Sequence, residues 1–346
     1  MSDLKVIGLD LAKNVFQVHG MSAEGRKVLG ARLKRKDVLH YFAKLPRVLV
    51  GMEACRGSHY WAREIGTLGH RVKLMAPQHV KSYVQGNKTD ARDAAAIAEA
   101  ASRECVREVA VRDEQSLQMQ SLHRVRELLM RQRIASANQI RGLLAEFGQV
   151  IPAGMKRLRE GVAQWQAHRQ AGREALHELI EQLMQVLRQT EEHIGRIEVR
   201  IKQGHRANPG SQLIETIPGV GVLTATAVTA SFGRCERFAS ARKFACCLGT
   251  TPRERSSGDN QRLLCISKRG NKYMRRLLIH GARAVLKARM NKPAHAQDWE
   301  VRLAKRRGHS IAAVALAAKN ARRIWAVLRT GKEFCANYAQ VPAGCA

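Results

Sequence analysis

The sequence contains few of the features that mark secreted, membrane or zinc-binding proteins. Its eight cysteines form no C-x-x-C pair and no Cys/His spacing typical of zinc. No apolar run approaches the roughly 20 residues that a membrane-spanning helix needs, and the N-terminal MSDLKVIGLDLAK has no signal-peptide pattern. We therefore expect a cytoplasmic protein without a membrane partner, whose cysteines are buried as small apolar side chains.

Acidic and aromatic residues are also scarce. Asp and Glu number 29 against 60 Lys and Arg, which gives a formal net charge of +31. Such an excess favours a nucleic-acid partner, because basic side chains that displace condensed counterions gain affinity. Aromatic residues make up only 5% of the chain, so stacking on unpaired bases should not dominate binding. The composition predicts a protein that binds the backbone of helical nucleic acid and is associated with the bacterial nucleoid.

The first hundred residues alternate strand and helix patterns. Strands are predicted at 5–10, 15–19, 26–29, 47–52 and 71–75, and helices at 37–43, 58–68 and 90–103. Three adjacent strands followed by alternating strands and helices are typical of an RNase H-like fold. A doubly wound nucleotide-binding domain is the alternative, but the G-x-G-x-x-G turn after the first strand is absent.

Strand patterns disappear further along the chain. Apolar residues at helical spacing over 111–205 predict two long helices in an antiparallel coiled-coil hairpin, which could serve dimerisation, nucleic-acid grip or simple spacing. A mostly helical domain is expected over 206–331 and a loose tail over 332–346. The predicted fold is therefore α/β over 1–110 and helical beyond.

Four acidic residues fall at the ends of predicted elements. Asp10 ends the first strand, Glu53 follows the fourth, and Asp90 and Asp93 share one face at the start of a helix. The first and fourth strands of an RNase H-like sheet are neighbours, so the four carboxylates can converge. Mg²⁺ would relieve their repulsion, and two ions can clamp a phosphodiester for in-line displacement. Taken singly, each acid could be a helix cap, a dipole partner or a solvated strand end.

Several motifs in order along the chain resemble the IS110/IS1111 family of insertion-sequence transposases. They are GLDLAKNVFQVHG, GMEACRGSHYWA, APQHVKSYVQGNKTDARDA, IPGVGVLTATAV, LGTTPRERSSG and ISKRGNKYMRRLLIHGA. The resemblance implies a RuvC-like domain with a DEDD tetrad at Asp10, Glu53, Asp90 and Asp93, a coiled coil, and a C-terminal transposase domain with a serine nucleophile. It also implies a structured noncoding guide (bridge) RNA that pairs with donor and target DNA.

By the same resemblance, the nucleophile lies in RERSSG, at Ser257 or Ser256. Ser257 is preferred because the family pattern has serine directly before glycine. A serine hydroxyl needs a base or a polarised phosphate, so serine and metal ions would act in one composite site. The expected reaction is transesterification through a covalent DNA–serine link, which a second DNA hydroxyl resolves. An ordinary polar turn is the alternative for this segment.

Two further segments are expected to contact nucleic acid. Residues 217–221 (IPGVG) resemble the hairpin of helix-hairpin-helix DNA binders, in which Gly219 and Gly221 let backbone N–H groups approach phosphate. A plain turn that needs glycine is the alternative. The basic segment 268–276 (KRGNKYMRR) adds further predicted contacts: Lys268, Arg269, Asn271, Lys272, Arg275 and Arg276.

The favoured function is that of a transposase or recombinase that excises and inserts an insertion sequence by Mg²⁺-dependent strand cleavage and exchange. Because recombination joins two duplexes, a homodimer or homotetramer is expected. A RuvC-like Holliday-junction or structure-specific nuclease is the alternative, with the same acids activating water and no serine required. A non-catalytic DNA-binding or RNA-chaperone protein would explain the charge but not the four acids.

Overall fold

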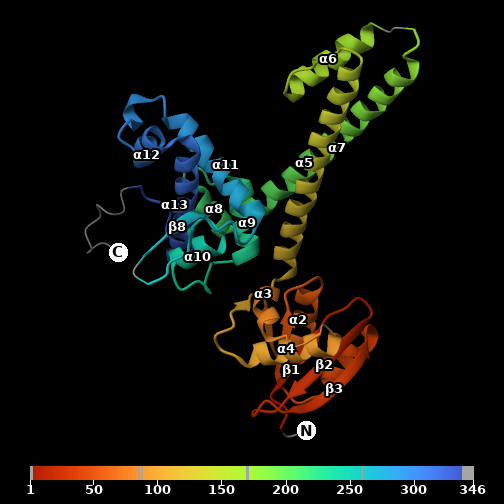
Figure 1. Ribbon diagram of the computed structural model, residues 1–346, viewed down its shortest axis with the longest axis vertical. Coiled ribbons are helices and arrows are strands. Elements are labelled where there is room, and N and C mark those ends of the chain that lie inside the picture. Colours follow the sequence, from red (N-terminus) through yellow and green to blue (C-terminus); the bar gives the residue numbers. More distant parts are fainter. Residues whose placement is uncertain (1–2, 85, 88, 169–170, 259, 337–346) are drawn as a thin grey trace. The chain divides into compact units, whose positions relative to one another are not determined.

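The computed structural model describes residues 3–84, 86–87, 89–168, 171–258 and 260–336 (Figure 1). The chain divides into two compact units, Met1–Asp113 and Glu114–Ala346. Mixed α/β structure in the first unit and mostly helical structure in the second agree with the predicted fold class. The finer division at residues 110, 205 and 331 stays a prediction, and most of the predicted tail lies outside the described residues.

The first unit is built on a six-stranded sheet in the order β3-β2-β1-β4-β5-β6. The strands are β1 (Val6–Asp10), β2 (Val15–Met21), β3 (Lys27–Lys34), β4 (Leu49–Glu53), β5 (Arg71–Met75) and β6 (Glu108–Val109). Strand β1 pairs antiparallel with β2 and parallel with β4, so the first and fourth strands are neighbours, as predicted. Strand β3 is longer than predicted because it pairs with β2 over nearly its whole length.

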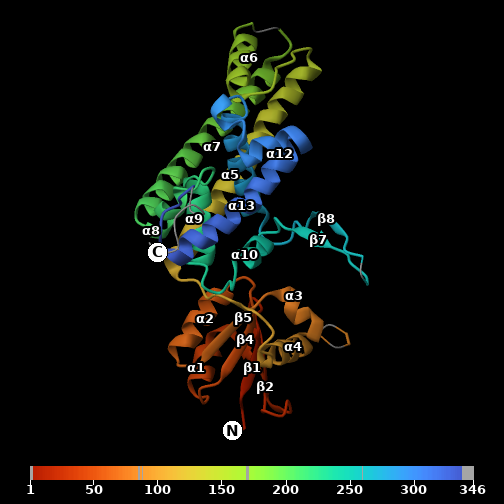
Figure 2. The ribbon, with the colours of Figure 1, turned by 90° about the vertical axis from the view of Figure 1, so that its left-hand side faces the viewer.

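Helices cover both faces of this sheet (Figure 2). On one side lie α1 (Val38–Ala43) and α2 (Ser58–Thr67), and on the other lie α3 (Pro77–Val80) and α4 (Asp90–Ser102). The first side is filled by large apolar residues such as Leu9, Phe16 and Trp61. On the other side, the buried face of α4 consists mainly of alanine, so α4 can lie close to the sheet.

In the second unit, α5 (Glu114–Glu146) and α7 (Glu174–Arg206) form an antiparallel pair with the shorter α6 (Met155–Ala167) between them in sequence (Figure 1). Two ion pairs set the register of the long helices: Arg126 with Glu198 at 2.6 Å and Arg133 with Glu191 at 2.8 Å. Both long helices were predicted from sequence, whereas α6 was not.

The remaining helices enclose a separate apolar core. They are α8 (Pro209–Glu215), α9 (Val222–Phe232), α10 (Ala241–Cys247), α11 (Lys272–Arg289), α12 (Trp299–Arg307) and α13 (His309–Thr330). The base of α5 docks here through His123, whose ring nitrogens lie 2.9 Å from the hydroxyls of Tyr273 and Thr226. This buried polar contact joins α5 to α9 and α11.

The cysteines of the described chain depart from the expectation of burial. Cys235 is buried, but the other described cysteines are exposed: Cys55, Cys105, Cys246, Cys247, Cys265 and Cys335. The prediction was wrong for these because they occupy loops, a helix end and an exposed hairpin strand rather than core positions. Across the described residues, we find no helix with the length and apolarity to cross a membrane.

Candidate active site and nucleic-acid contacts

Asp10 and Glu53 stand at the same edge of the sheet. They are the last residues of β1 and β4, which run parallel as neighbours. Side chains alternate between the two faces of a sheet, so Asp10 shares a face with Gly8, and Glu53 shares that face with Gly51. This is the face that α4 covers, because Gly8 and Gly51 both lie directly beneath that helix.

Helix α4 approaches the sheet so closely that only glycine fits beneath it. A Cβ atom on Gly8 would stand 2.1 Å from the backbone oxygen of Ala94, and one on Gly51 would stand 2.5 Å from the Cβ of Ala101. The two glycines are directly opposite each other on β1 and β4. Their missing side chains therefore set the distance between α4 and the strands that carry Asp10 and Glu53.

The start of α4 supplies the other two acids. Thr89 caps the helix, and its hydroxyl accepts a hydrogen bond from the Arg92 backbone N–H at 3.3 Å. The explanation of Asp90 as the helix cap is therefore wrong. Asp90 is the first helical residue, and Asp93 lies in the same turn.

Asp10 experiences the charges of the other three predicted acids. The pKa of Asp10 is raised to about 6, first by burial and then by the nearby charges of Asp93, Asp90 and Glu53 in that order of importance, against an opposing hydrogen bond from a backbone N–H. The pKa of the Cys55 thiol is raised by partial desolvation, although the residue as a whole is exposed, and then by Glu53 and Asp10. The charges of the other three acids therefore act on Asp10.

The chemistry of these donors suits a hard divalent cation. Mg²⁺ prefers carboxylate oxygens, and its charge would oppose the repulsion acting on Asp10. In the part of the chain that the structure describes, no three His, Cys, Asp or Glu side chains already form a metal-binding group. The residues that would hold the ion are Asp10, Glu53, Asp90 and Asp93.

The two candidate serines lie in an exposed hairpin between β7 (Pro252–Glu254) and β8 (Leu263–Ile266). The Ser256 hydroxyl donates to the Glu254 carboxylate at 2.8 Å and accepts from the Arg262 backbone N–H at 3.3 Å. Ser257 pairs with Asn260 through the backbone, and its hydroxyl has no hydrogen-bond partner among the described residues. Ser256 therefore helps to hold the loop, whereas Ser257 presents a hydroxyl to solvent.

Arg275 does not fit its predicted role as a phosphate contact. Its side chain is buried, and its guanidinium donates to the backbone oxygens of Leu248 at 3.1 Å and Arg269 at 2.9 Å. A buried guanidinium that is committed to two carbonyl groups cannot reach a phosphate. We therefore correct this assignment: Arg275 stabilises the loop before α11.

Asn271 also has a structural role. It is the N-cap of α11, and its side-chain oxygen accepts from the backbone N–H groups of Tyr273 and Met274. The remaining basic residues of this segment are exposed, as a phosphate contact requires: Lys268, Arg269, Lys272 and Arg276. Their assignment to nucleic acid stays a prediction.

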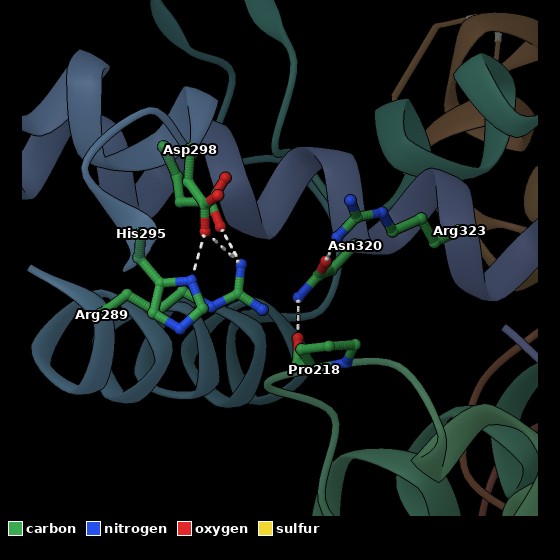
Figure 3. Close-up of polar contacts among 7 residues, drawn as sticks. Pro218, Arg289, His295, Asp298, Asn320 and Arg323 are labelled. Atoms are coloured by element: carbon green, nitrogen blue, oxygen red, sulfur yellow. Dashed lines mark hydrogen bonds and ion pairs between the residues drawn. The ribbon is translucent and has the colours of Figure 1, made fainter. Parts of the chain in front are cut away.

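The turn at residues 217–221 packs against two helices. Gly219 has a φ of +88°, and a Cβ on Gly281 of α11 would stand 1.8 Å from the Gly219 oxygen. The Pro218 oxygen accepts a hydrogen bond from the Asn320 side chain of α13 at 2.8 Å (Figure 3). Close packing and backbone conformation therefore suffice to require glycine at 219, while Gly221 is exposed at the start of α9.

Sequence reasoning missed the residues that set the spacing of the acidic cluster. Gly8 and Gly51 contribute no functional group, but they allow α4 to bring Asp90 and Asp93 towards the ends of β1 and β4. The available signal was an isolated glycine inside each of two β-rich runs, KVIGLD and RVLVGM, which often marks close approach of another backbone.

An α/β unit with acids at neighbouring element ends, in a strongly basic chain, fits the class of DNA transposases, and comparison with known proteins agrees. A family model described as "Transposase IS116/IS110/IS902 family" matches residues 211–300, and a second, described as "Transposase" and named for DEDD and IS110, matches residues 7–148. The chain belongs to the IS110/IS116/IS902 family of transposases.

Individual relatives cover almost the whole chain. A "Probable family 20 transposase" of Pseudomonas aeruginosa is 46% identical over 96% of this chain and 98% of its own length. The transposase for insertion sequence element IS1111A of Coxiella burnetii is 41% identical over 95% of this chain and 90% of its own. The transposase for IS1328 of Yersinia enterocolitica is 35% identical over 96% and 99%, respectively.

Proposed function

We propose that this transposase cleaves and exchanges DNA strands with Mg²⁺ held by Asp10, Glu53, Asp90 and Asp93 and with Ser257 as nucleophile. The observation that carries the proposal is the close packing of α4, which begins with Asp90 and Asp93, on β1 and β4, which end with Asp10 and Glu53. The strand order, with β1 between an antiparallel and a parallel neighbour, favours an RNase H-like, RuvC-like domain.

When bound, Mg²⁺ would supply Lewis-acid stabilisation of charge on the phosphodiester. The protein's own groups position the carboxylates and the nucleophile. Asp10 accepts a hydrogen bond from the Leu11 backbone N–H, which helps to fix its carboxylate. In the hairpin, Ser256 is held by Glu254, so that the neighbouring Ser257 hydroxyl stays exposed for attack on phosphorus.

The reaction we propose is transesterification. The Ser257 oxygen forms a bond to phosphorus, the DNA 3′ or 5′ oxygen leaves with a proton, and a covalent DNA–serine link results. Attack by a second DNA hydroxyl restores the phosphodiester and releases the serine, so no ATP is consumed. Donor and target DNA are the proposed substrates, and a structured noncoding guide RNA supplies sequence recognition by base pairing.

The long α5–α7 pair is proposed to form a coiled-coil arm through which a homodimer or homotetramer assembles. Its two helices are held by ion pairs that leave exposed apolar side chains, including Val125, Ile134 and Leu179. We also propose that the protein associates with the nucleoid, because its net charge of +31 favours DNA.

Trapping of a covalent adduct tests the nucleophile. Labelled DNA carrying the ends of the element is incubated with Mg²⁺ and the protein, and the mixture is denatured to retain only covalent complexes. Wild type and Ser256→Ala should form a protein–DNA adduct, and Ser257→Ala should not. Free cleaved ends from Ser257→Ala, with no adduct from wild type, would instead support a nuclease that activates water. Sequencing of RNA that copurifies with the protein tests the guide.

A further inference from the structure

Basic side chains form a continuous stripe along one face of α11. Its members are three or four residues apart, a spacing that keeps side chains on one side of a helix: Lys272, Arg276, His280, Arg283 and Lys287. All five are exposed, and α11 itself contains no acidic residue. With a rise of about 1.5 Å per residue, the stripe is about 22 Å long.

Positive charge is least compensated in the C-terminal half of this stripe. Arg276 forms an ion pair with a glutamate of α5 at 2.9 Å. Arg289, which lies off the stripe, contacts two acids of the following segment at 3.1 and 2.5 Å (Figure 3). By contrast, Arg283 and Lys287 form no ion pair with any described residue.

The same half of α11 borders a pocket of about 360 Å³. The pocket is lined by Arg283, Ala284, Lys287, Met290, Asn291 and His309. Most of the lining surface is apolar, but the lining includes an arginine, a lysine, an amide and an imidazole, which can donate hydrogen bonds to phosphate oxygens.

His309 also brings the start of a second helix to this pocket. It is the first residue of the 22-residue α13, whose first turn holds no acidic side chain. The first N–H groups of a helix have no partner within the helix and carry partial positive charge. The three basic residues at the end of α12, Lys305, Arg306 and Arg307, directly precede this start and are exposed.

We propose that the α11 stripe and its adjoining pocket bind the phosphodiester backbone of duplex DNA, with Arg283 and Lys287 contacting phosphates. The inference extends the proposed function and rests on it for the choice of DNA, since a transposase acts on that polymer. The stripe is long enough to meet several phosphates, since one strand of duplex DNA carries a phosphate about every 3.4 Å of helix axis.

Binding of a 20-base-pair duplex DNA of arbitrary sequence, measured by fluorescence anisotropy over a range of NaCl concentrations, tests this surface. EDTA is present throughout, so that neither the metal nor serine chemistry affects the result. The variant is Arg283→Ala with Lys287→Ala in the full chain. The matched control, Lys156→Ala with Arg157→Ala, removes the same two charges from exposed positions on α6.

Loss of two phosphate contacts should reduce the slope of log K against log[NaCl] by about 1.8, because each contact contributes about 0.9. At 0.1 M salt this corresponds to about 60-fold weaker binding, if the contacts contribute nothing at 1 M. Arg283→Lys with Lys287→Arg keeps both charges and should bind as wild type does.

An unchanged slope for the alanine variant, or an equal change for the α6 control, would overturn the proposal. So would a loss confined to duplex RNA of the same sequence, because the surface would then serve the guide rather than DNA. A failure here leaves adduct formation by Ser257 and metal binding by the four acids intact, since neither enters the binding measurement.

Discussion

Replacement of Gly8 by alanine should separate the two halves of the acidic cluster. The new Cβ would stand 2.1 Å from the Ala94 oxygen, whereas real Cβ contacts essentially never fall below 3.0 Å. Neither atom belongs to a flexible side chain, so α4 must move away from β1 by about 1 Å. Asp90 and Asp93 would move with it, while Asp10 stays on the strand.

Gly8→Ala should affect the cleavage rate more strongly than the folding free energy. Overpacking of this kind costs about 1–3 kcal/mol of folding free energy. A displacement of about 1 Å at a catalytic site can reduce the rate about 10²-fold. Strand cleavage should therefore fall far more than the folded fraction does, when activity is measured well below the unfolding midpoint.

Gly66→Ala is the matched control. Gly66 lies in α2 of the same unit, and a Cβ there would meet nothing within 4 Å. This change should stabilise the protein by about 0.5–1 kcal/mol and leave cleavage unchanged. Denaturant unfolding followed by circular dichroism and cleavage of element-end DNA provide the two readouts. Wild-type cleavage by folded Gly8→Ala would refute the role assigned to the α4 contact.

Three further predictions concern the second unit. Gly281→Ala should destabilise the fold by about 1–3 kcal/mol, because its Cβ would stand 1.8 Å from a backbone oxygen. In the same denaturant titrations Gly195→Ala should stabilise the fold, because a Cβ there would meet nothing within 4 Å. Burial lowers the pKa of His123 to about 4 from 6.5, so the unfolded chain takes up the proton first as pH falls. The free energy of unfolding should be retained above about pH 6.5 and fall by about 3 kcal/mol towards pH 4. His123→Asn should flatten this part of the pH profile. Arg275→Ala should cost about 2–3 kcal/mol in thermal unfolding because two buried carbonyls lose their donor, and an equal loss from the exposed Arg276→Ala would contradict this distinction.

The sequence was most informative where local pattern and function coincide. Strand β5 occupies the predicted residues, and Asp90 begins a helix as predicted, because β-rich runs and an acidic helix start are local signals. The placement of Asp10 and Glu53 at the ends of neighbouring strands could be anticipated once β1 and β4 were taken as neighbours. The close approach of α4 was not predicted, since it depends on which alanines meet Gly8 and Gly51 across the sheet.

Charge alone did not distinguish surface from interior. Arg275 lies in a run of basic residues, yet its guanidinium is buried against two carbonyl groups, an outcome set by tertiary packing. Arg283 and Lys287 lie in a less basic stretch and were not selected, although helical periodicity places them on one exposed face with Lys272 and Arg276. Helical periodicity was therefore a better guide to the exposed stripe than the density of basic residues.

The central claim is that four carboxylates share a divalent metal. Crystals of the protein soaked in Mn²⁺, as an anomalously scattering substitute for Mg²⁺, would test it without reference to activity. We predict an anomalous peak at coordination distance, about 2 Å, from Asp10 and at least one of the other three acids, and its loss in Asp10→Asn. Saturating Mn²⁺ with no peak beside Asp10, or an undiminished peak in Asp10→Asn, would contradict the account.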